Sequence, residues 1–111
     1  MKRLKESEKI ELKKSTSELK EAIISIVSIL NKHGQGKIYF GIKNDGTIIG
    51  QDVSENTLRE ISKAISDNME PKIYPNIERI SIENKICISV RFNGENKPYF
   101  AYGRAYIRIA D

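Results

Sequence analysis

Cations interleaved with tyrosines are the side chains of this sequence with the clearest capacity for chemistry. Lysine and arginine neutralise phosphates and tyrosine rings can stack on unpaired bases, so together they have the ingredients of a nucleic-acid surface. Each one alone is more often a solubilising or half-buried side chain than a contact. The candidate contacts are Lys13, Lys14, Lys32, Lys37, Lys43, Lys97, Tyr99, Tyr102, Arg104, Tyr106 and Arg108.

The net charge of the chain supports this interpretation only weakly. Nineteen basic and fifteen acidic residues give a formal charge of +4 and a pI near 9.2, a modest excess that many proteins without a polyanionic partner share. Basic residues outnumber acidic ones in residues 1–50 and 97–111, whereas acidic residues predominate in residues 51–96. A basic face therefore requires a fold that brings the two ends together.

Metal and thiol chemistry have few candidate residues. Cys87 is the single cysteine and His33 the single histidine, so an internal disulfide and a Cys/His metal cluster are both excluded. Any bound metal would need carboxylate ligands. We expect His33 to lie at a helix end and Cys87 to be a small, semi-buried side chain.

The apolar segments are too short to cross a membrane. The longest, residues 22–30, is interrupted by Ser25 and Ser28, whereas a bilayer needs about 20 consecutive apolar residues. The amino terminus is charged rather than signal-like. We therefore expect a cytoplasmic protein with no membrane partner.

Helical and strand periods indicate the elements that must position these side chains. Residues 9–13 alternate polar and apolar types as a short half-buried strand does. Residues 15–18 fit a capping box, which begins a helix that Gly34 ends as a left-handed C-cap. A second helix follows Ser54 and carries apolar residues on one side as far as Ile65.

Two hairpins are predicted in addition to the helices. Residues 37–42 and 47–49 form strands joined by Asn44-Asp45-Gly46, residue types that tolerate the positive φ of tight turns. Residues 80–82 and 86–92 form the second hairpin, and the longer strand has one fully apolar face.

The carboxyl-terminal residues 97–108 alternate again and predict a last strand. Arg104, Tyr106 and Arg108 fall on one side of it, which would give that strand a basic, aromatic face. The whole pattern predicts one α+β domain over residues 1–111, a mixed, largely antiparallel sheet of about five or six strands with two main helices. Strand order cannot be inferred from the pattern.

Three stretches in matching order resemble the Schlafen AlbA-like family, whose members are often described as DNA-binding and found at the front of bacterial regulator-like or helicase-related proteins. The first stretch is Glu6-Ser7 with Ile10-Glu11-Leu12-Lys13, the second runs from Asn31 through Gly34 and Gly36 to Gly50, and the third is Lys97-Pro98-Tyr99 with Tyr106-Ile107-Arg108. The resemblance implies a nucleic-acid-binding module, the N-terminal part of a longer protein.

Some Schlafen relatives are RNA endonucleases that hold a divalent metal with three carboxylates. Glu6 and Glu11 resemble the first two, whereas the third falls at Asn44, whose amide cannot supply a carboxylate's charge to a hard cation. This alternative therefore needs Asp45 as the third catalytic carboxylate and Mg²⁺ or Mn²⁺ as cofactor. Otherwise these glutamates belong to a solvated strand edge beside neighbouring lysines.

The function we predict is non-catalytic binding of DNA or RNA, without a cofactor, by one module of a larger regulatory or helicase-related protein. A metal-dependent ribonuclease of the Schlafen type is the first alternative. A protein-interaction or dimerisation module is the second. The partners would be nucleic acid, downstream domains of the same protein and, if the chain oligomerises, further copies of itself.

Overall fold

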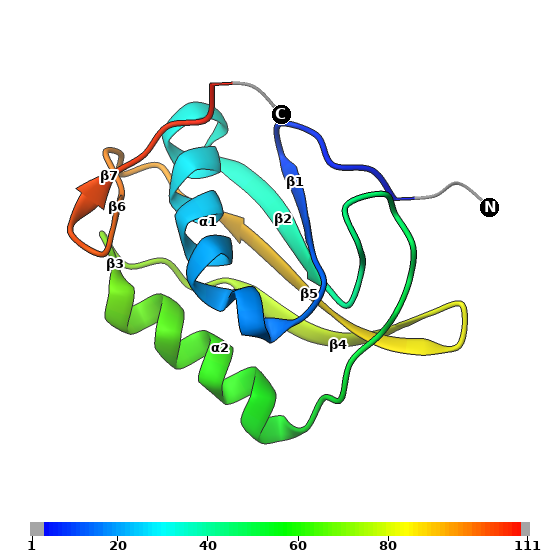
Figure 1. Ribbon diagram of the computed structural model, residues 1–111. Helices are drawn as coiled ribbons and strands as arrows, with labels where there is room; N and C mark the ends of the chain where they lie inside the picture. The colour runs from blue at the N-terminus through cyan, green and yellow to red at the C-terminus, as the bar shows by residue number, and fades with distance from the viewer. Residues whose placement is uncertain (1–3, 110–111) are drawn as a thin grey trace.

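A four-stranded sheet forms the centre of the computed structural model, which describes residues 4–109 (Figure 1). Its strands, in spatial order, are β1 (Ile10–Lys13), β2 (Gln35–Phe40), β5 (Lys85–Asn93) and β4 (Asn76–Ile82). β1 runs parallel to β2, and the other two pairings are antiparallel. The mixed, largely antiparallel sheet expected from the sequence is therefore confirmed.

A second, smaller sheet contains β3 (Met69–Glu70), β6 (Phe100–Ala101) and β7 (Arg104–Ala105), in that order. It brings the number of strands within residues 4–109 to seven, slightly above the expected five or six. With the two α-helices the architecture is α+β, as predicted. No helix in this part of the chain has the length and apolar composition to cross a membrane.

The helix α1 (Leu19–His33) connects β1 to β2, as a parallel pair of strands requires. It begins after a short 3-10 turn, η1 (Thr16–Glu18), which Ser15 caps through its hydroxyl. The Glu18 carboxylate accepts the backbone N–H of Lys14 at 2.9 Å. The predicted capping residues therefore satisfy free N–H groups, although Glu18 reaches one residue further back than a capping box requires.

The other helix boundaries also agree with the predicted signals. α1 ends at Gly34, which has a φ of 79° and donates its N–H to the carbonyl of Leu30 at 3.0 Å. α2 (Glu55–Asn68) begins with a complete capping box: Ser54 accepts the N–H of Thr57 through its hydroxyl, and the Thr57 hydroxyl accepts the N–H of Ser54.

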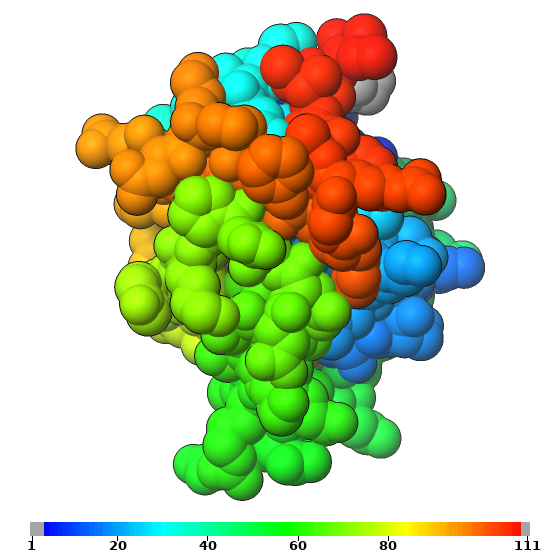
Figure 2. All heavy atoms as spheres, turned by 90° about the vertical axis from the view of Figure 1, so that its left-hand side faces the viewer, coloured from blue at the N-terminus to red at the C-terminus, as the bar shows by residue number. Residues whose placement is uncertain are grey.

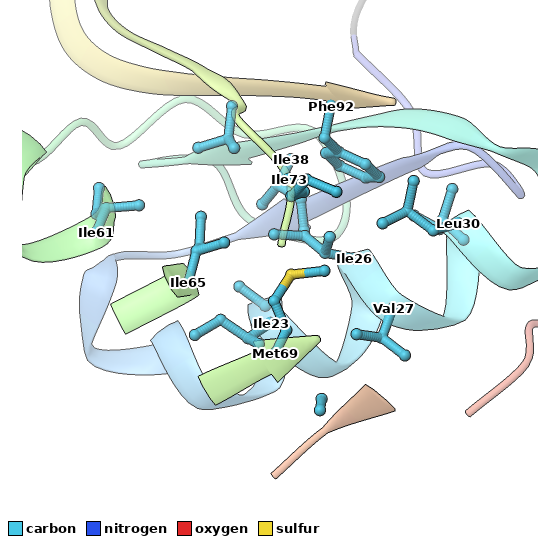
Figure 3. Close-up of a cluster of buried hydrophobic side chains, with 14 of the residues drawn as sticks. Ile23, Ile26, Val27, Leu30, Ile38, Ile61, Ile65, Met69, Ile73 and Phe92 are labelled. Carbon is cyan, nitrogen blue, oxygen red and sulfur yellow. The ribbon is translucent and has the colours of Figure 1, made fainter. Parts of the chain in front are cut away.

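Both helices pack on the same face of the four-stranded sheet and form the main core with it (Figures 1 and 3). Because successive strand residues point to opposite faces, the alternate side chains of β2 and β5 face away from the helices. The core residues labelled in Figure 3 are Ile23, Ile26, Val27, Leu30, Ile38, Ile61, Ile65, Met69, Ile73 and Phe92.

The opposite face of the sheet is only partly covered. Leu12, Ile42 and Cys87 form a small buried cluster there, so Cys87 is fully buried and not semi-buried as expected. Beyond this cluster the face carries Lys37, Arg91 and other polar side chains. We call this part, which lies opposite the helices, the open face.

The Asn44-Asp45-Gly46 turn is confirmed, but the hairpin built on it is short. Gly46 has a φ of 91° and donates its N–H to the carbonyl of Lys43 at 2.8 Å, as a tight turn requires. The predicted strand over residues 47–49 reduces to a single bridge between Ile42 and Ile48. The second hairpin is more extensive, because β4 and β5 pair from Asn76 opposite Arg91 to Ile82 opposite Lys85.

The prediction of one last strand over residues 97–108 is wrong. The chain reverses through Tyr102 and Gly103, at φ values of 52° and 77°, so that β6 and β7 form a two-residue hairpin. β6 pairs with β3 and does not extend the main sheet. Figure 2 shows this orange-to-red segment lying against α1, in blue and cyan, and the green residues of α2 and the segment after it.

Candidate nucleic-acid interface

Lys37 and Arg91 are direct neighbours on the open face. They are paired across the antiparallel strands β2 and β5, and side chains at such positions start about 5 Å apart. Lys9, just before β1, joins them because its carbonyl accepts the backbone N–H of Lys37 at 2.8 Å. All three cations are exposed, although they come from three distant parts of the sequence.

An open groove of about 600 Å³ is lined by these three cations. Its other polar lining residues carry amide side chains, which can both donate and accept hydrogen bonds. Tyr74, two residues before β4, also lines the groove, and 93% of its surface is exposed. The groove therefore combines cations, an aromatic ring and amides, the last supplied by Gln35, Asn76 and Asn93.

The positive charge of the groove is only partly neutralised. Arg91 lies 3.5 Å from the carboxylate of Glu78, and because both side chains are about half exposed the pair contributes little free energy. Within residues 4–109, neither Lys9 nor Lys37 forms an ion pair. These lysines can therefore bind an external anion without first losing a partner.

Three predicted contacts, Lys97, Tyr102 and Arg104, are exposed but lie around β6 and β7. The ammonium of Lys20 lies 5.4 Å from the centre of the Tyr102 ring, within the range of a cation–π interaction. Burial, and then the negative charge of Glu21, raises the pKa of Tyr102. None of these three residues lines the groove.

The cations near the ends of β1 and α1 are also separate from the groove lining. Lys14 and Lys43 are exposed on adjoining segments, because the carbonyl of Lys13 accepts two N–H groups from the residues after β2. Lys32 forms an ion pair with Glu8. Hydrogen bonds from Lys32, and then from the neighbouring histidine, lower the pKa of Glu8.

The strand face predicted from Arg104, Tyr106 and Arg108 does not form, and the predicted contact Tyr99 is not exposed. Tyr99 is 1% exposed in the main core, and Tyr106 is partly buried against it. Arg108 donates to the Glu11 carboxylate at 2.8 Å and to the carbonyl of Ser7 at 3.0 Å. Their types suggested contacts with a ligand, but core packing and internal pairing occupy these side chains.

The match to known protein families covers nearly the whole chain. A model of the family described as Schlafen, AlbA_2 matches residues 6–111. The chain belongs to the Schlafen AlbA_2 family. The family resemblance expected from the three sequence stretches is therefore confirmed.

Solved structures share the fold of this Schlafen AlbA_2 domain. The N-terminal domain of a RecG-related helicase protein from Nitrosomonas europaea matches with a TM-score of 0.70 and 20% identity, over 97% of this chain and 82% of that one. The DIP2311 protein from Corynebacterium diphtheriae matches with a TM-score of 0.72 and 10% identity, over 98% of this chain and 23% of that one. No curated protein matches the sequence.

The carboxylates of the nuclease alternative are only partly brought together in this Schlafen AlbA_2 domain. Glu6 accepts the N–H of Leu12 at 3.2 Å and lies beside Glu11. Burial raises the pKa of Glu6 above 4.5, against the opposing effect of that hydrogen bond, and the charge of Glu11 raises it further. Glu11 itself is paired with Arg108 and, at 3.3 Å, with Lys13.

The third expected ligand does not complete a metal site. Asp45 lies in the exposed turn, where its carboxylate accepts the N–H of Thr47 at 2.9 Å. In the described range 4–109, no group of three or more His, Cys, Asp or Glu side chains is arranged to hold a metal ion. Glu6 and Glu11 therefore form a pair at the sheet edge without Asp45.

Of the groove residues described above, sequence reasoning predicted only Lys37; the most important ones that it missed are Lys9, Arg91 and Tyr74. Arg91 lies on the face of its strand opposite the predicted apolar one, but its position beside Lys37 depends on the strand order. One feature of the sequence could have drawn attention to Tyr74. It is an aromatic residue between Ile73 and Pro75, just before a strand. Only the pairing of β2 with β5 makes these residues a common surface.

Proposed function

We propose that this Schlafen AlbA_2 domain binds nucleic acid through the groove on its open face. The observation that carries the proposal is the pairing of Lys37 with Arg91 across two central strands, with Lys9 beside them. Rigid strands hold these cations at a fixed spacing. Adjacent cations on such a support suit the repeated phosphates of a nucleic-acid backbone, because each neutralised phosphate releases bound counterions.

The surroundings of the cations support the same ligand class. The amide groups of Gln35, Asn76 and Asn93 can hydrogen-bond to phosphate, sugar or base edges. The fold neighbour from Nitrosomonas europaea is a domain of a helicase-related protein, and DIP2311 is several times longer than its matched region. We accordingly propose that the domain serves as the nucleic-acid-binding module of a larger regulatory or helicase-related protein.

A salt titration tests the proposal. Fluorescence anisotropy should detect binding of labelled DNA or RNA at low salt, and log affinity should fall linearly with log salt concentration. The double substitution Lys37→Ala and Arg91→Ala should reduce the slope by about two, roughly one for each lost phosphate contact. Both side chains are exposed, so the fold should be retained, which circular dichroism can verify.

The matched control removes two cations from the surface of α2, Arg59→Ala and Lys63→Ala. These side chains are 71% and 78% exposed and pair with acidic residues of their own helix. The control has the same change in net charge and should leave the slope nearly unchanged. Absence of binding to every single- or double-stranded ligand at low salt would contradict the proposal, as would equal losses in both double variants.

A further inference from the structure

Tyr74 has no evident role in holding the fold together. Its side chain is exposed almost completely, at 93%, whereas Tyr99 is fully buried. Exposed tyrosines are common, and exposure alone points to no ligand. Tyr74 differs because it lines the same groove as Lys37 and Arg91, so an aromatic face lies beside two cations, of which Lys37 has no ion pair within residues 4–109.

The backbone around Tyr74 is firmly held. Ile73, the preceding residue, is 8% exposed and points into the main core, where Figure 3 shows it near Ile38 and Phe92. Pro75, the following residue, restricts the backbone of Tyr74 to extended conformations. Asn76 then begins β4, opposite Arg91. The ring is therefore presented beside the cations at low conformational cost, although nothing covers it.

We infer that the groove takes single-stranded nucleic acid, with an unpaired base stacked on Tyr74 while the backbone phosphates contact Lys37 and Arg91. The inference rests on the proposed function and specifies its substrate class. In a duplex the base faces are occupied by neighbouring bases, so a duplex offers phosphates, sugars and groove edges but no free face to stack on Tyr74. A single strand can present a base face and a phosphate to the groove together.

The amide side chains of the groove fit the same geometry. An unstacked base exposes its Watson–Crick edge, and an amide can donate to or accept from that edge, whereas a paired base has those groups occupied. Asn93 lies on β5, the strand of Arg91, and Asn76 lies opposite Arg91 on β4, so both line the same groove as the ring. Stacking and edge contacts would thus both select unpaired bases.

The test compares a labelled single strand, the same strand annealed to its complement, and the same strand with abasic sites. Wild type should bind the single strand more tightly than the other two. Tyr74→Ala should weaken binding of the single strand about five-fold or more, the range for loss of one stacked base, and should leave duplex binding unchanged. Tyr74→Phe keeps the ring and should retain the affinity.

Tyrosine fluorescence supplies a second measurement, because the chain contains no tryptophan. Stacking of a base on Tyr74 should quench part of the emission, and Tyr74→Phe should lose this quenching while still binding. Since the ring is almost fully exposed, Tyr74→Ala should keep the thermal midpoint of the wild type. Affinity and folding can therefore be separated.

The possible results separate the two proposals. If no ligand binds at low salt, the proposed function itself fails. If the Lys37→Ala and Arg91→Ala double variant weakens binding while Tyr74→Ala does not, the function stands and the single-strand inference is overturned. Equal or tighter binding of the duplex by wild type would also overturn the inference.

Discussion

Glu6 and Glu11 are neighbouring carboxylates at the edge of the sheet, but only Glu11 has strong cationic partners. Arg108 and Lys13 pair with Glu11, whereas Glu6 has one backbone N–H and partial burial. Two adjacent carboxylates resist ionising together. Burial therefore raises the pKa of Glu6, and the charge of Glu11, which stays ionised beside its two cations, raises it further.

The substitution Glu6→Gln should stabilise the protein at neutral pH. A raised pKa means that the folded state binds the proton of Glu6 more tightly than the unfolded state does. Ionisation of Glu6 therefore lowers the free energy of unfolding as the pH rises through the folded pKa. Below the ordinary value of 4.5 both states are protonated, so the gain should disappear there.

Urea unfolding of both proteins between pH 3 and 7 measures this difference. Glutamine can still accept the N–H of Leu12, so that hydrogen bond need not be lost. Glu95→Gln, in an exposed loop, provides the control and should have a much smaller effect on stability across the range. A variant of Glu6 that is less stable than wild type at pH 7 would show that the ionised carboxylate stabilises the fold.

At the level of elements, the short carboxyl-terminal hairpin depends on one residue of α1. The amide nitrogen of Asn31 donates to the carbonyls of Tyr99 and Tyr106, at 2.9 and 2.6 Å, and its oxygen accepts the N–H of Tyr99 at 2.7 Å. A two-stranded hairpin is marginal by itself in water. These three bonds attach β6 and β7 to a long, well-packed helix.

Asn31→Asp tests this attachment. The carboxylate keeps an acceptor for Tyr99 but loses both donors and places a negative charge beside two carbonyls. We expect a loss of about 1–3 kcal/mol in the free energy of unfolding and faster amide exchange in β6 and β7. Asn56→Asp, exposed in the first turn of α2, exchanges a surface hydrogen bond to Glu60 for a favourable charge at the helix start and should change the free energy of unfolding much less. An unchanged unfolding midpoint for Asn31→Asp would show that Asn31 does not stabilise the attachment of β6 and β7 to α1.

Local patterns predicted the elements that depend on nearby residues. α1 ends at the expected Gly34, α2 begins at the expected cap Ser54, and the long hairpin of β4 and β5 follows from alternation and turn residues. The carboxyl-terminal segment could not be predicted in this way. Asn31 acts on a residue 68 positions away, and Arg108 on one 101 positions away. Residue types do not reveal such partners.

The candidate site also depends on contacts between residues that are distant in the sequence. Lys37 was predicted as a contact, but Lys9, Tyr74 and Arg91 join it only because β2 lies between β1 and β5. Strand order was unreadable from the pattern. Conversely, Tyr99 and Arg108 are of types that suit a ligand surface, yet the fold buries or pairs them.

Across the whole molecule, the two basic ends of the sequence do meet, but not as the expected binding face. Arg108 reaches Ser7 and Glu11, so its charge is used within the protein. The groove instead takes its cations from Lys9, Lys37 and Arg91, spread across the chain. The distribution of charge along the sequence therefore did not indicate where the groove lies.

We expect the domain to bind nucleic acid without cleaving it and without a metal ion. The third carboxylate is absent at Asn44, and Glu11 is held by two cations. EDTA should leave the affinity unchanged, and labelled RNA should remain intact with Mg²⁺ or Mn²⁺. Cleavage that Glu11→Gln abolishes, with the fold retained by circular dichroism, would assign the domain to the ribonuclease alternative.

The buried position of Cys87 has a practical consequence. Its thiol lies beneath the open face with 0% exposure, and burial raises its pKa, so the reactive thiolate is scarce near neutral pH. The native protein should therefore resist maleimide reagents while folded. A cysteine introduced in place of Tyr74 would be the preferred site of modification. A single fluorophore or spin label there could report on the surroundings of the groove, and Cys87 would not have to be removed.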